Sequence, residues 1–443
     1  MSKLMQKIAC IVMCVLICVS FCSCELVESV LFEGTLGMPE DTSLGYVRME
    51  NYDFEYSEYY KNIENTSSYD SLENDGMRAL YDELYQSVYY VYPQPNDNGE
   101  YKTKQVVLKG VVLSEAQIRL TIKALTDDNP ELFFVSSTFG FLINEDKNYI
   151  CAQLYSSMSP SELQVSINEL KSTVDSFYST LQEGLSKYQL ELLIHDYIID
   201  TVEYDESVTL NSSGHPSDST NAFSSYGALV EKRAVCEGYS RAFQLLLNGV
   251  GINCINVIGE SQDELHMWSA IMLDGDYYYV DVTWDDNDNK ALRYDYFNIN
   301  EDQLLVDHKF SRLYSEMTDA EICGFGNTNA LTSNFYIPQC DSIAYNYYVR
   351  EAVHLTGFYN GNVEESLMQS ALKKDKYFHI YIDPREFSYN NAIDLLFNTY
   401  PQHFFSYVKN VNNRLSEYSI DIKNLSVCKR KNLSVVTVEL VYV

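Results

Sequence analysis

Basic residues are scarce in this sequence of 443 residues. It contains 31 Lys and Arg against 63 Asp and Glu, which gives a formal net charge of −32. Such a balance argues against binding to nucleic acid and against electrostatic attachment to anionic lipid, because both partners are themselves negative. The acidic side chains are expected to form a solvated surface, and no nucleic-acid partner is predicted.

Cysteines are few once the first 24 residues are set aside, and none of them forms a close-spaced pair or a Cys/His cluster of the kind that binds zinc. Six remain: Cys151, Cys236, Cys254, Cys323, Cys340 and Cys428. A chain of this length can bury an adequate core without disulfides. If one of the six has to stay free as a nucleophile, at most two disulfides are possible. We therefore expect no metal, no organic cofactor and no disulfide scaffold.

A long apolar run occurs only at the N-terminus. Lys3 and Lys7 precede the run over 8–21, and Ser23 and Cys24 follow it, which is the pattern of a secretory signal. The run is too short to span a bilayer comfortably. Its ending, F-C-S-C, resembles a bacterial lipobox, which implies lipidation of Cys24 as the first residue of the mature protein. We expect an extracytoplasmic, membrane-anchored lipoprotein, with plain cleavage and secretion as the alternative.

The rest of the chain shows no internal repeat and divides into segments of different composition. We predict a signal at 1–24, an acidic tether at 25–71, a small N-terminal α+β region at 72–157, a core at 158–325 and a C-terminal α+β domain at 326–443. Capping boxes at Ser114–Gln117 and Ser186–Gln189 and a proline-opened helix at Ser159 are helix starts.

Two further elements are predicted from local pattern. Apolar residues at helical spacing from Met77 to Val88 predict a helix over 75–90, ended by Pro93 and Pro95. A strand is predicted over 347–356 in the C-terminal domain.

One stretch, 234–286, contains the residues that can do chemistry. Its first part reads A-V-C-E-G-Y-S-R-A-F, and an apolar stripe at four-residue spacing continues beyond Cys236 with Tyr239, Phe243 and Leu247. This spacing predicts a helix that begins near Cys236 and ends at Gly249. The unpaired N–H groups and the dipole at a helix N-terminus favour thiolate over thiol.

The second part of the stretch predicts a β-hairpin around Asp274-Gly275. If these two residues form the loop, Leu273 pairs with Asp276. His266 and Asp281 then lie on the same face as diagonal neighbours, within reach of a hydrogen bond. A three-residue loop would shift the register by one and place them on opposite faces.

A carboxylate that orients an imidazole beside a cysteine at a helix N-terminus is the arrangement that nucleophilic acyl transfer needs. The runs V-C-E-G-Y-S-R-A-F, H-M-W-S and V-D-V-T-W-D-D resemble the transglutaminase-like superfamily of papain-type cysteine enzymes, most closely its bacterial secreted branch. The resemblance extends from Leu190 to His308, with a departure at Met267. It implies that Cys236 is the nucleophile, His266 the base and Asp281 the residue that orients it.

The resemblance also implies a fold and further roles. The fold class would be α+β, with a papain-like core in which a helix bearing the cysteine packs on an antiparallel sheet bearing the histidine and the aspartate. Tyr226 is a candidate oxyanion donor, with a packing tyrosine as the alternative. The polar loop over 205–225 is expected to form a lid or a wall of the cleft. His195 and His308 are expected to be structural, and D-D-N-D-N-K is expected to be a solvated turn rather than a calcium site.

The function that the resemblance implies is cysteine-dependent acyl transfer outside the cytoplasm. The enzyme would act on peptide or side-chain amides through a thioester, most simply as a peptidase or amidase with water as the acceptor. An amine-accepting, cross-linking transglutaminase is one alternative, and a catalytically weak surface-binding lipoprotein is the other. The expected partners are a protein or peptide substrate and the membrane, through a lipid on Cys24.

Overall fold

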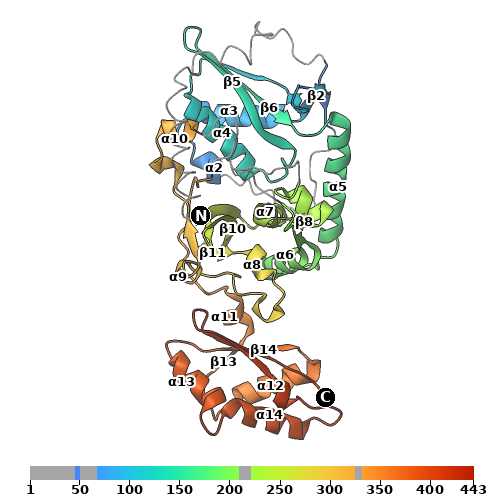
Figure 1. Ribbon diagram of the computed structural model, residues 1–443, viewed down its shortest axis with the longest axis vertical. Coiled ribbons are helices and arrows are strands. Elements are labelled where there is room, and N and C mark those ends of the chain that lie inside the picture. The colour runs from blue at the N-terminus through green and yellow to red at the C-terminus, as the bar shows by residue number, and fades with distance from the viewer. Residues whose placement is uncertain (1–44, 50–66, 209–220, 325–331) are drawn as a thin grey trace, which may run out of the picture. The chain divides into compact units, whose positions relative to one another are not determined.

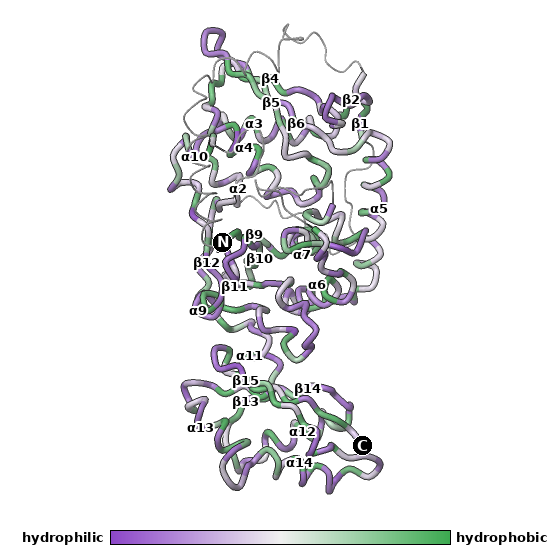
Figure 2. Tube along the Cα trace, in the orientation of Figure 1, coloured by the Kyte–Doolittle hydropathy of each residue, from purple (hydrophilic) through white to green (hydrophobic). Residues whose placement is uncertain are grey.

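The computed structural model describes residues 45–49, 67–208, 221–324 and 332–443. The chain divides into two units, Met1–Tyr46 and Val47–Val443, and the architecture below is that of the second. The predicted signal with Cys24, and most of the predicted tether, lie outside the described residues. Among the described helices none is long and apolar enough to cross a membrane, and hydrophobic and hydrophilic residues are interspersed along the elements (Figure 2).

An N-terminal sheet of six strands runs in the order β1-β2-β3-β6-β4, and β5 pairs with β6. The strands are β1 (Val47–Arg48), β2 (Tyr90–Pro95), β3 (Tyr101–Thr103), β4 (Val106–Lys109), β5 (Val135–Asn144) and β6 (Tyr149–Ser156). The helices of this region, drawn in blue to green in Figure 1, are α2 (Ser67–Asp70), α3 (Asp75–Ser87), α4 (Glu115–Asp128) and α5 (Pro160–Tyr178). The predicted capping boxes at Ser114 and Ser186 and the proline-opened helix start at Ser159 are confirmed, because each serine accepts the third helical N–H.

The helix predicted over 75–90 is confirmed only to Ser87. Prolines 93 and 95 do not end it, because they lie in β2, which starts at Tyr90 and pairs with β1 and β3. Tyr90, Val91 and Tyr92 favour extended backbone. Because these residues pair with two neighbouring strands, the helix does not continue through them as its apolar spacing predicted.

The central part of the chain packs helices against an antiparallel sheet of order β11-β10-β9-β12. The elements are α6 (Lys187–Thr201), β7 (Glu203–Tyr204), the π-helix η1 (Gly227–Glu231), β8 (Arg233–Ala234), α7 (Cys236–Gly249), β9 (Cys254–Ser261), β10 (Glu264–Leu273), β11 (Asp276–Val280), α8 (Val282–Asp285), η2 (Lys290–Leu292), α9 (Glu301–Leu304), β12 (His308–Phe310), η3 (Tyr314–Glu316) and α10 (Asp319–Cys323). The mixed α+β class is therefore confirmed.

Helix α7 contacts β9 and β10 and α6 (Figure 1). Its predicted apolar stripe is confirmed, since Tyr239, Phe243 and Leu247 are fully buried in one cluster with residues of α6 and of the hairpin. Tyr178, at the end of α5, donates its hydroxyl to the Leu246 carbonyl and closes the far end of α7. These contacts fix where the first turn of α7 lies relative to the sheet.

The hairpin has the predicted register. Asp274 and Gly275 both have positive φ, of 52° and 97°, as a two-residue type I′ turn requires. Leu273 pairs with Asp276, and the ladder continues to Ser269 and Val280.

Gly259 lets β9 and β12 approach closely. A Cβ at this position would lie 2.0 Å from the carbonyl oxygen of Lys309 and 2.5 Å from the ring of Trp268. No side chain fits there unless β12 moves away from β9.

Gly259→Ala is therefore expected to lower the free energy of unfolding by about 1–3 kcal/mol, the usual cost of overpacking. Urea unfolding of the purified protein measures it. Gly357→Ala is the matched control, because its new methyl would meet only the Asn360 side chain at 3.1 Å, and a shift below about 0.5 kcal/mol is expected. Equal effects of the two substitutions would contradict this account of β12.

The C-terminal residues form a sheet of order β13-β14-β16-β15 with helices packed on it. Its elements are α11 (Tyr347–Glu351), β13 (Val353–His354), α12 (Asn362–Lys373), β14 (Tyr377–Tyr381), α13 (Tyr389–Ile393), η4 (Asp394–Asn398), α14 (His403–Arg414), η5 (Ile422–Asn424), β15 (Ser426–Arg430) and β16 (Val435–Glu439). The strand predicted over 347–356 is wrong for its first half. Asn346 caps α11 by accepting the N–H groups of Tyr348 and Val349, so a helical turn replaces extended backbone.

Arg430 joins this sheet to the central part of the chain. Its side chain is buried, donates to the Ala291 carbonyl at 3.0 Å, and lies 3.3 Å from Asp295. Tyr348 lies under its guanidinium, 5.0 Å from ring centroid to cation. A buried cation needs such partners, and Arg430 finds them in the carbonyl, the carboxylate and the aromatic ring.

Candidate active site

Cys236 is the first residue of α7 and is partly exposed. The preceding residue, Val235, is the N-cap and contributes no side-chain hydrogen bond to the helix, whereas α4, α5 and α6 are each closed by a serine. The N–H groups of the first turn of α7 are thus left without the usual capping oxygen. Beside the thiol they form a local source of positive potential.

The chain before α7 lies directly against its first turn. A Cβ on Gly238 would come within 2.3 Å of the Ala222 carbonyl oxygen, and Val235 N–H donates to the same oxygen at 3.0 Å. The end of the loop predicted over 205–225 is therefore a wall beside Cys236. Residues 209–220 of that loop lie outside the described residues.

Tyr204, at the end of β7, lies on the open side of the site. Its side chain is 49% exposed. The pKa of Tyr204 is raised, mainly because part of its ring is buried and to a smaller extent because of the charges of Cys236 and Glu264. Glu264 and the neighbouring Glu206 are exposed as well.

His266, on β10, faces Asp281 as predicted. Its Nε2 lies 2.6 Å from Asp281 Oδ2, and both side chains are buried. Burial disfavours the charged imidazole, but the charge and hydrogen bond of Asp281, joined by a hydrogen bond with Cys236, raise the pKa of His266 to about 10. Because Nε2 is occupied by Asp281, Nδ1 is the nitrogen left for the thiol. The structure thus brings together Cys236, His266 and Asp281, with a hydrogen bond between His266 and Asp281 and the Cys236 thiol close enough to affect the pKa of His266.

Asp281 is held from both sides of its carboxylate. It is the N-cap of α8, and Oδ1 accepts the N–H groups of Thr283 and Trp284 at 3.0 and 3.1 Å. Oδ2 accepts from His266 and from a second imidazole, His308 Nε2, at 3.1 Å. Burial alone would raise the pKa of this carboxyl, but the two histidines hold the pKa of Asp281 well below its usual range.

The segment that contains α8 is tied to α7. Tyr239, on α7, donates its hydroxyl to Asp286 Oδ2 at 2.7 Å. The same hydroxyl approaches the Val202 carbonyl at 3.2 Å. Because this bond joins α7 to the chain just beyond α8, it sets the distance between the thiol and the carboxylate.

His308 is the site residue that the sequence analysis missed. We expected it to be structural, but its ring is fully buried and lies against Asp281. The rings of Trp268 and Trp284, the two tryptophans of the sequence, lie next to the His308 ring, with centroid distances of 5.1 and 5.0 Å. No spacing along the chain relates it to Asp281, because the contact depends on the pairing of β12 with β9.

Three donor atoms, on His266, Asp281 and His308, come within 4.8 Å of one another, a grouping that could hold a metal ion. Two ligands of a tetrahedral zinc ion, each at about 2.0 Å from the metal, lie about 3.3 Å apart. The 2.6 Å separation between His266 Nε2 and Asp281 Oδ2 is shorter and is that of a charge-assisted hydrogen bond. The arrangement therefore fits a proton-sharing cluster better than a metal centre.

Tyr226 is engaged away from the thiol. Its hydroxyl donates to Glu169 Oε2, on α5, at 2.6 Å, and its ring stacks on Phe133 with centroids 4.9 Å apart. Its one hydroxyl proton is used in that bond, so the packing role fits this position better than the predicted oxyanion role.

A second buried histidine–carboxylate pair lies under α6. His195 Nε2 is 3.1 Å from Asp285 Oδ2 and its Nδ1 is 3.3 Å from Asp196. Asp285 belongs to the run that we expected to form a solvated turn, and that expectation is wrong for this residue, which is 1% exposed. The pair joins α6 to α8 and, with His195 fully buried, agrees with the structural role predicted for His195.

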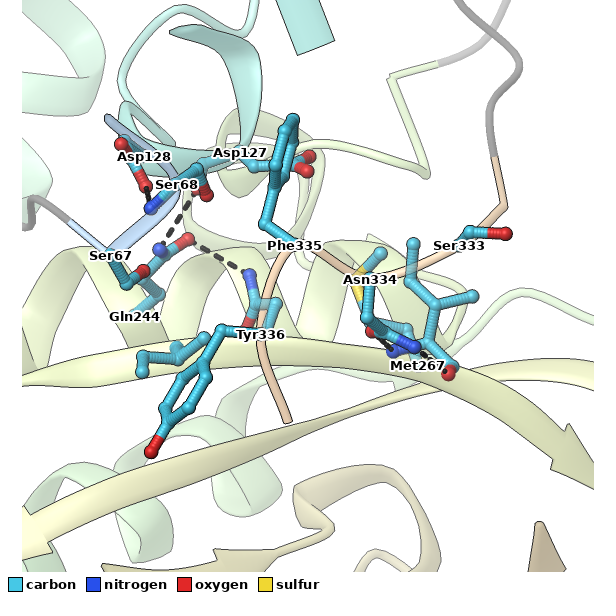
Figure 3. A pocket seen from close by; sticks show the side chains of 13 residues that line it. Ser67, Ser68, Asp127, Asp128, Gln244, Met267, Ser333, Asn334, Phe335 and Tyr336 are labelled. Atoms are coloured by element: carbon cyan, nitrogen blue, oxygen red, sulfur yellow. Dashed lines mark hydrogen bonds between the residues drawn. The ribbon is translucent and has the colours of Figure 1, made fainter. Parts of the chain in front are cut away.

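A small cavity lies on the other side of β10 (Figure 3). Met267, whose side chain alternates with that of His266, lines it together with Gln244, Asp127 and Phe335, and its volume is about 20 Å³. That is room for about one water molecule. A hollow of about 300 Å³ elsewhere is lined by residues of α3, α4 and α10. Neither is lined by Cys236, His266 or Asp281.

In the described part of the chain all six cysteines are free thiols.

Comparison with known proteins agrees with the resemblance. Residues 178–282 match the family model of the transglutaminase-like superfamily, a segment that contains Cys236, His266 and Asp281. A solved structure described as "Crystal structure of a TGase" is similar over 42% of this chain and 52% of that chain, at 12% identity and a TM-score of 0.24, so that the chain spans about half of its length. No curated protein matches.

Proposed function

We propose that the transglutaminase-like segment of this chain, residues 178–282, is the catalytic core of a cysteine-dependent acyl-transfer enzyme that acts on peptide or side-chain amides. The superfamily includes acyltransferases and peptidases that use a cysteine. The observation that carries the proposal is the position of His266, which is hydrogen-bonded to Asp281 through Nε2 and is influenced by the Cys236 thiol at the start of α7.

The acyl-transfer steps follow from these contacts. The Cys236 thiolate attacks the amide carbonyl carbon, and the N–H groups of the uncapped first turn of α7 are placed to donate to the oxygen that becomes negative. His266, as imidazolium, gives its proton to the leaving nitrogen, the C–N bond breaks, and a thioester remains. An incoming water then loses a proton to His266 and attacks the thioester, the C–S bond breaks, the acid is released, and the Cys236 thiolate is restored beside the His266 imidazolium. Asp281 keeps its negative charge throughout and orients the ring.

We propose water as the principal acceptor, which makes the enzyme a peptidase or amidase. Tyr204 is exposed and Cys236 is partly exposed, so solvent can reach the site, and this favours hydrolysis of a thioester. Incubation of a glutamine-containing peptide with the enzyme and a primary amine separates the alternatives, since hydrolysis gives ammonia and glutamate whereas cross-linking gives the amine adduct. An excess of adduct at millimolar amine would favour the transglutaminase.

The proposed ion pair predicts a reactive thiol. Iodoacetamide is expected to alkylate Cys236 at pH 6 at least about tenfold faster than the partly exposed Cys323, because a neighbouring imidazolium favours the reactive thiolate form of a cysteine. The pKa of His266, raised to about 10, keeps the imidazolium present until the pH rises toward that value, so the His266-dependent part of the rate should persist to about pH 9 and decline above it.

Peptide mapping of the alkylated protein measures these rates one cysteine at a time. His266→Ala should return the pH 6 rate of Cys236 to that of Cys323. Equal rates in the wild-type protein would refute the ion pair and would favour the alternative of a surface-binding protein that lacks catalysis.

We also propose that the protein acts outside the cytoplasm, anchored through a lipid on Cys24. This rests on the apolar run and the F-C-S-C ending alone. Cys24→Ala should move the protein from the membrane fraction into the soluble or unprocessed fraction and abolish incorporation of labelled palmitate. Labelling that persists in the variant would contradict the anchor, and cleavage without labelling in the wild type would favour plain secretion.

A further inference from the structure

We propose that His308 is a positioning residue of this site: a second, permanently protonated imidazole, held between Asp307 and Asp281, that fixes the Asp281 carboxylate and contributes a positive charge to the site. The inference deepens the proposed function and rests on it.

The first observation is that Asp281 has no unused acceptor position. An ionised carboxylate offers about four lone-pair sites, and here Oδ1 accepts two backbone N–H groups while Oδ2 accepts His266 Nε2 at 2.6 Å and His308 Nε2 at 3.1 Å. Of the two imidazoles, His266 also contacts Cys236. His308 therefore completes the set of bonds that orients the carboxylate but does not touch the thiol.

The second observation concerns the other nitrogen of His308. Nδ1 lies 2.7 Å from Asp307 Oδ1, and Asp307 Oδ2 accepts the hydroxyl of Tyr296 at 2.7 Å. Ionised carboxylates only accept hydrogen bonds. A ring with a carboxylate oxygen at each nitrogen has to carry a proton on both, so His308 is an imidazolium. Burial opposes this charge, but the hydrogen bonds to Asp281 and Asp307 outweigh it and raise the pKa of His308.

The groups around His308 belong to several elements. They are Asp281 at the start of α8, Asp307 beside β12, His266 on β10 with ring centroids 5.5 Å apart, and Tyr296 between η2 and α9. Lys309, which follows on β12, is exposed and pairs with Asp263. Two carboxylates thus face two imidazoles, and the cluster is neutral when both rings are protonated.

This arrangement has a consequence for the reaction. Part of the negative charge of Asp281 is shared with His308, so Asp281 stabilises the positive charge of the His266 ring less than a lone carboxylate would. His266 then gives its Nδ1 proton to the leaving nitrogen more readily, and the ring keeps its orientation because Asp281 still accepts the Nε2 proton. A displacement of about 1 Å in such a site can cost about 10²-fold in rate.

Two substitutions separate charge from position. His308→Gln keeps a donor toward Asp281 but removes the positive charge, and this disfavours loss of a proton from every group in the site. Both limbs of the pH profile for Cys236 alkylation and for amide hydrolysis should move to higher pH by roughly one unit, and turnover at pH 7 should fall about tenfold. His308→Leu also removes the donor and should lower turnover about 10²-fold. His354→Gln is the matched control, because that ring bonds only the Val349 carbonyl at 2.8 Å in the C-terminal domain, and its profile should overlay the wild type.

The protonation of His308 can be measured without any catalysis. Nitrogen-15 NMR of histidine-labelled full-length protein, assigned by the His308→Gln spectrum, should show both ring nitrogens of His308 protonated from about pH 5 to about pH 8, where a free imidazole loses its proton. Should His308→Gln fail to fold, Asp307→Asn serves in its place, because Asp307 is partly exposed. That variant removes a negative charge, so His308 should lose its second proton at lower pH and the alkylation profile should move to lower pH.

The outcomes are distinct. If Cys236 is reactive in the wild type but folded His308→Gln has an unshifted profile, or if His308 titrates near its free value, the positioning role is wrong and the proposed function stands. If Cys236 is unreactive while His308 is doubly protonated, the proposed function is wrong and the role of His308 in it falls as well.

Discussion

Cys236→Ala is expected to abolish acyl transfer, lowering kcat/KM by about 10⁴- to 10⁶-fold, the usual cost of removing a nucleophile that forms a covalent intermediate. Cys254, the next cysteine along the chain, cannot take its place. Cys254 is fully buried in β9, and burial raises the pKa of its thiol, so it is neither accessible nor ionised.

The measurement is single-turnover mass spectrometry of the acyl-enzyme together with the steady-state rate. The wild type should accumulate an adduct on Cys236, and the variant should show none. Cys323→Ala is the matched control, because Cys323 is also partly exposed but lies on α10, which packs against α4. A variant at position 236 that keeps even a hundredth of the wild-type rate would show that the thiol is not the nucleophile, whereas a loss of activity in the control would point to general damage by cysteine replacement.

Asp281→Asn is expected to lower kcat by about 10³- to 10⁴-fold, because the amide favours the wrong tautomer of His266 and removes the charge that stabilises the imidazolium. It should also lower the free energy of unfolding by about 3–5 kcal/mol, the cost of breaking a buried charged pair. Both losses have the same cause, since the amide nitrogen cannot accept from His266 and His308 as Oδ2 does.

The stability loss should depend on pH. The pKa of Asp281 is depressed in the folded protein, so its contribution is complete above about pH 3.9, the value of an unfolded aspartate, and is lost as the pH falls below that. The pKa of His266 is raised to about 10, so its contribution is complete below about pH 6.5 and is lost as the pH rises toward 10. The difference in the free energy of unfolding between the wild type and Asp281→Asn should therefore be largest from about pH 4 to about pH 6.5.

Urea unfolding of both proteins at pH 3, 5, 7 and 9 tests this dependence, and the hydrolysis rate at pH 7 tests the loss of kcat. Asp288→Asn is the matched control, since Asp288 is exposed in the turn that follows α8 and should change neither quantity appreciably. If the stability difference between wild type and variant is the same at all four pH values, the Asp281 carboxylate and the His266 imidazole are not an ion pair. Less than a tenfold fall in kcat would remove Asp281 from the mechanism.

The sequence by itself determined the local parts of the site. The stripe from Tyr239 to Leu247 placed Cys236 at the start of α7, and Asp274-Gly275 set the register that brings His266 to Asp281. These predictions succeeded because they depend on residues close together in the chain, where side-chain periodicity and turn conformation leave one solution. The triad as a whole was predicted from its resemblance to a family of enzymes, and the model of that family matches the segment 178–282.

Only the tertiary structure decided which other groups meet the site. His308 reaches Asp281 across 27 residues, and Tyr226 donates to Glu169 across 57. These contacts depend on strand order and on how the helices pack, and neither of these produces a repeating pattern in the sequence. His308 lies beside Asp281 because β12 pairs with β9, and this pairing is possible because Gly259 has no side chain at the point of closest approach. A glycine in a strand is by itself only a sign of some close approach, and the partner is known only once the strands are paired.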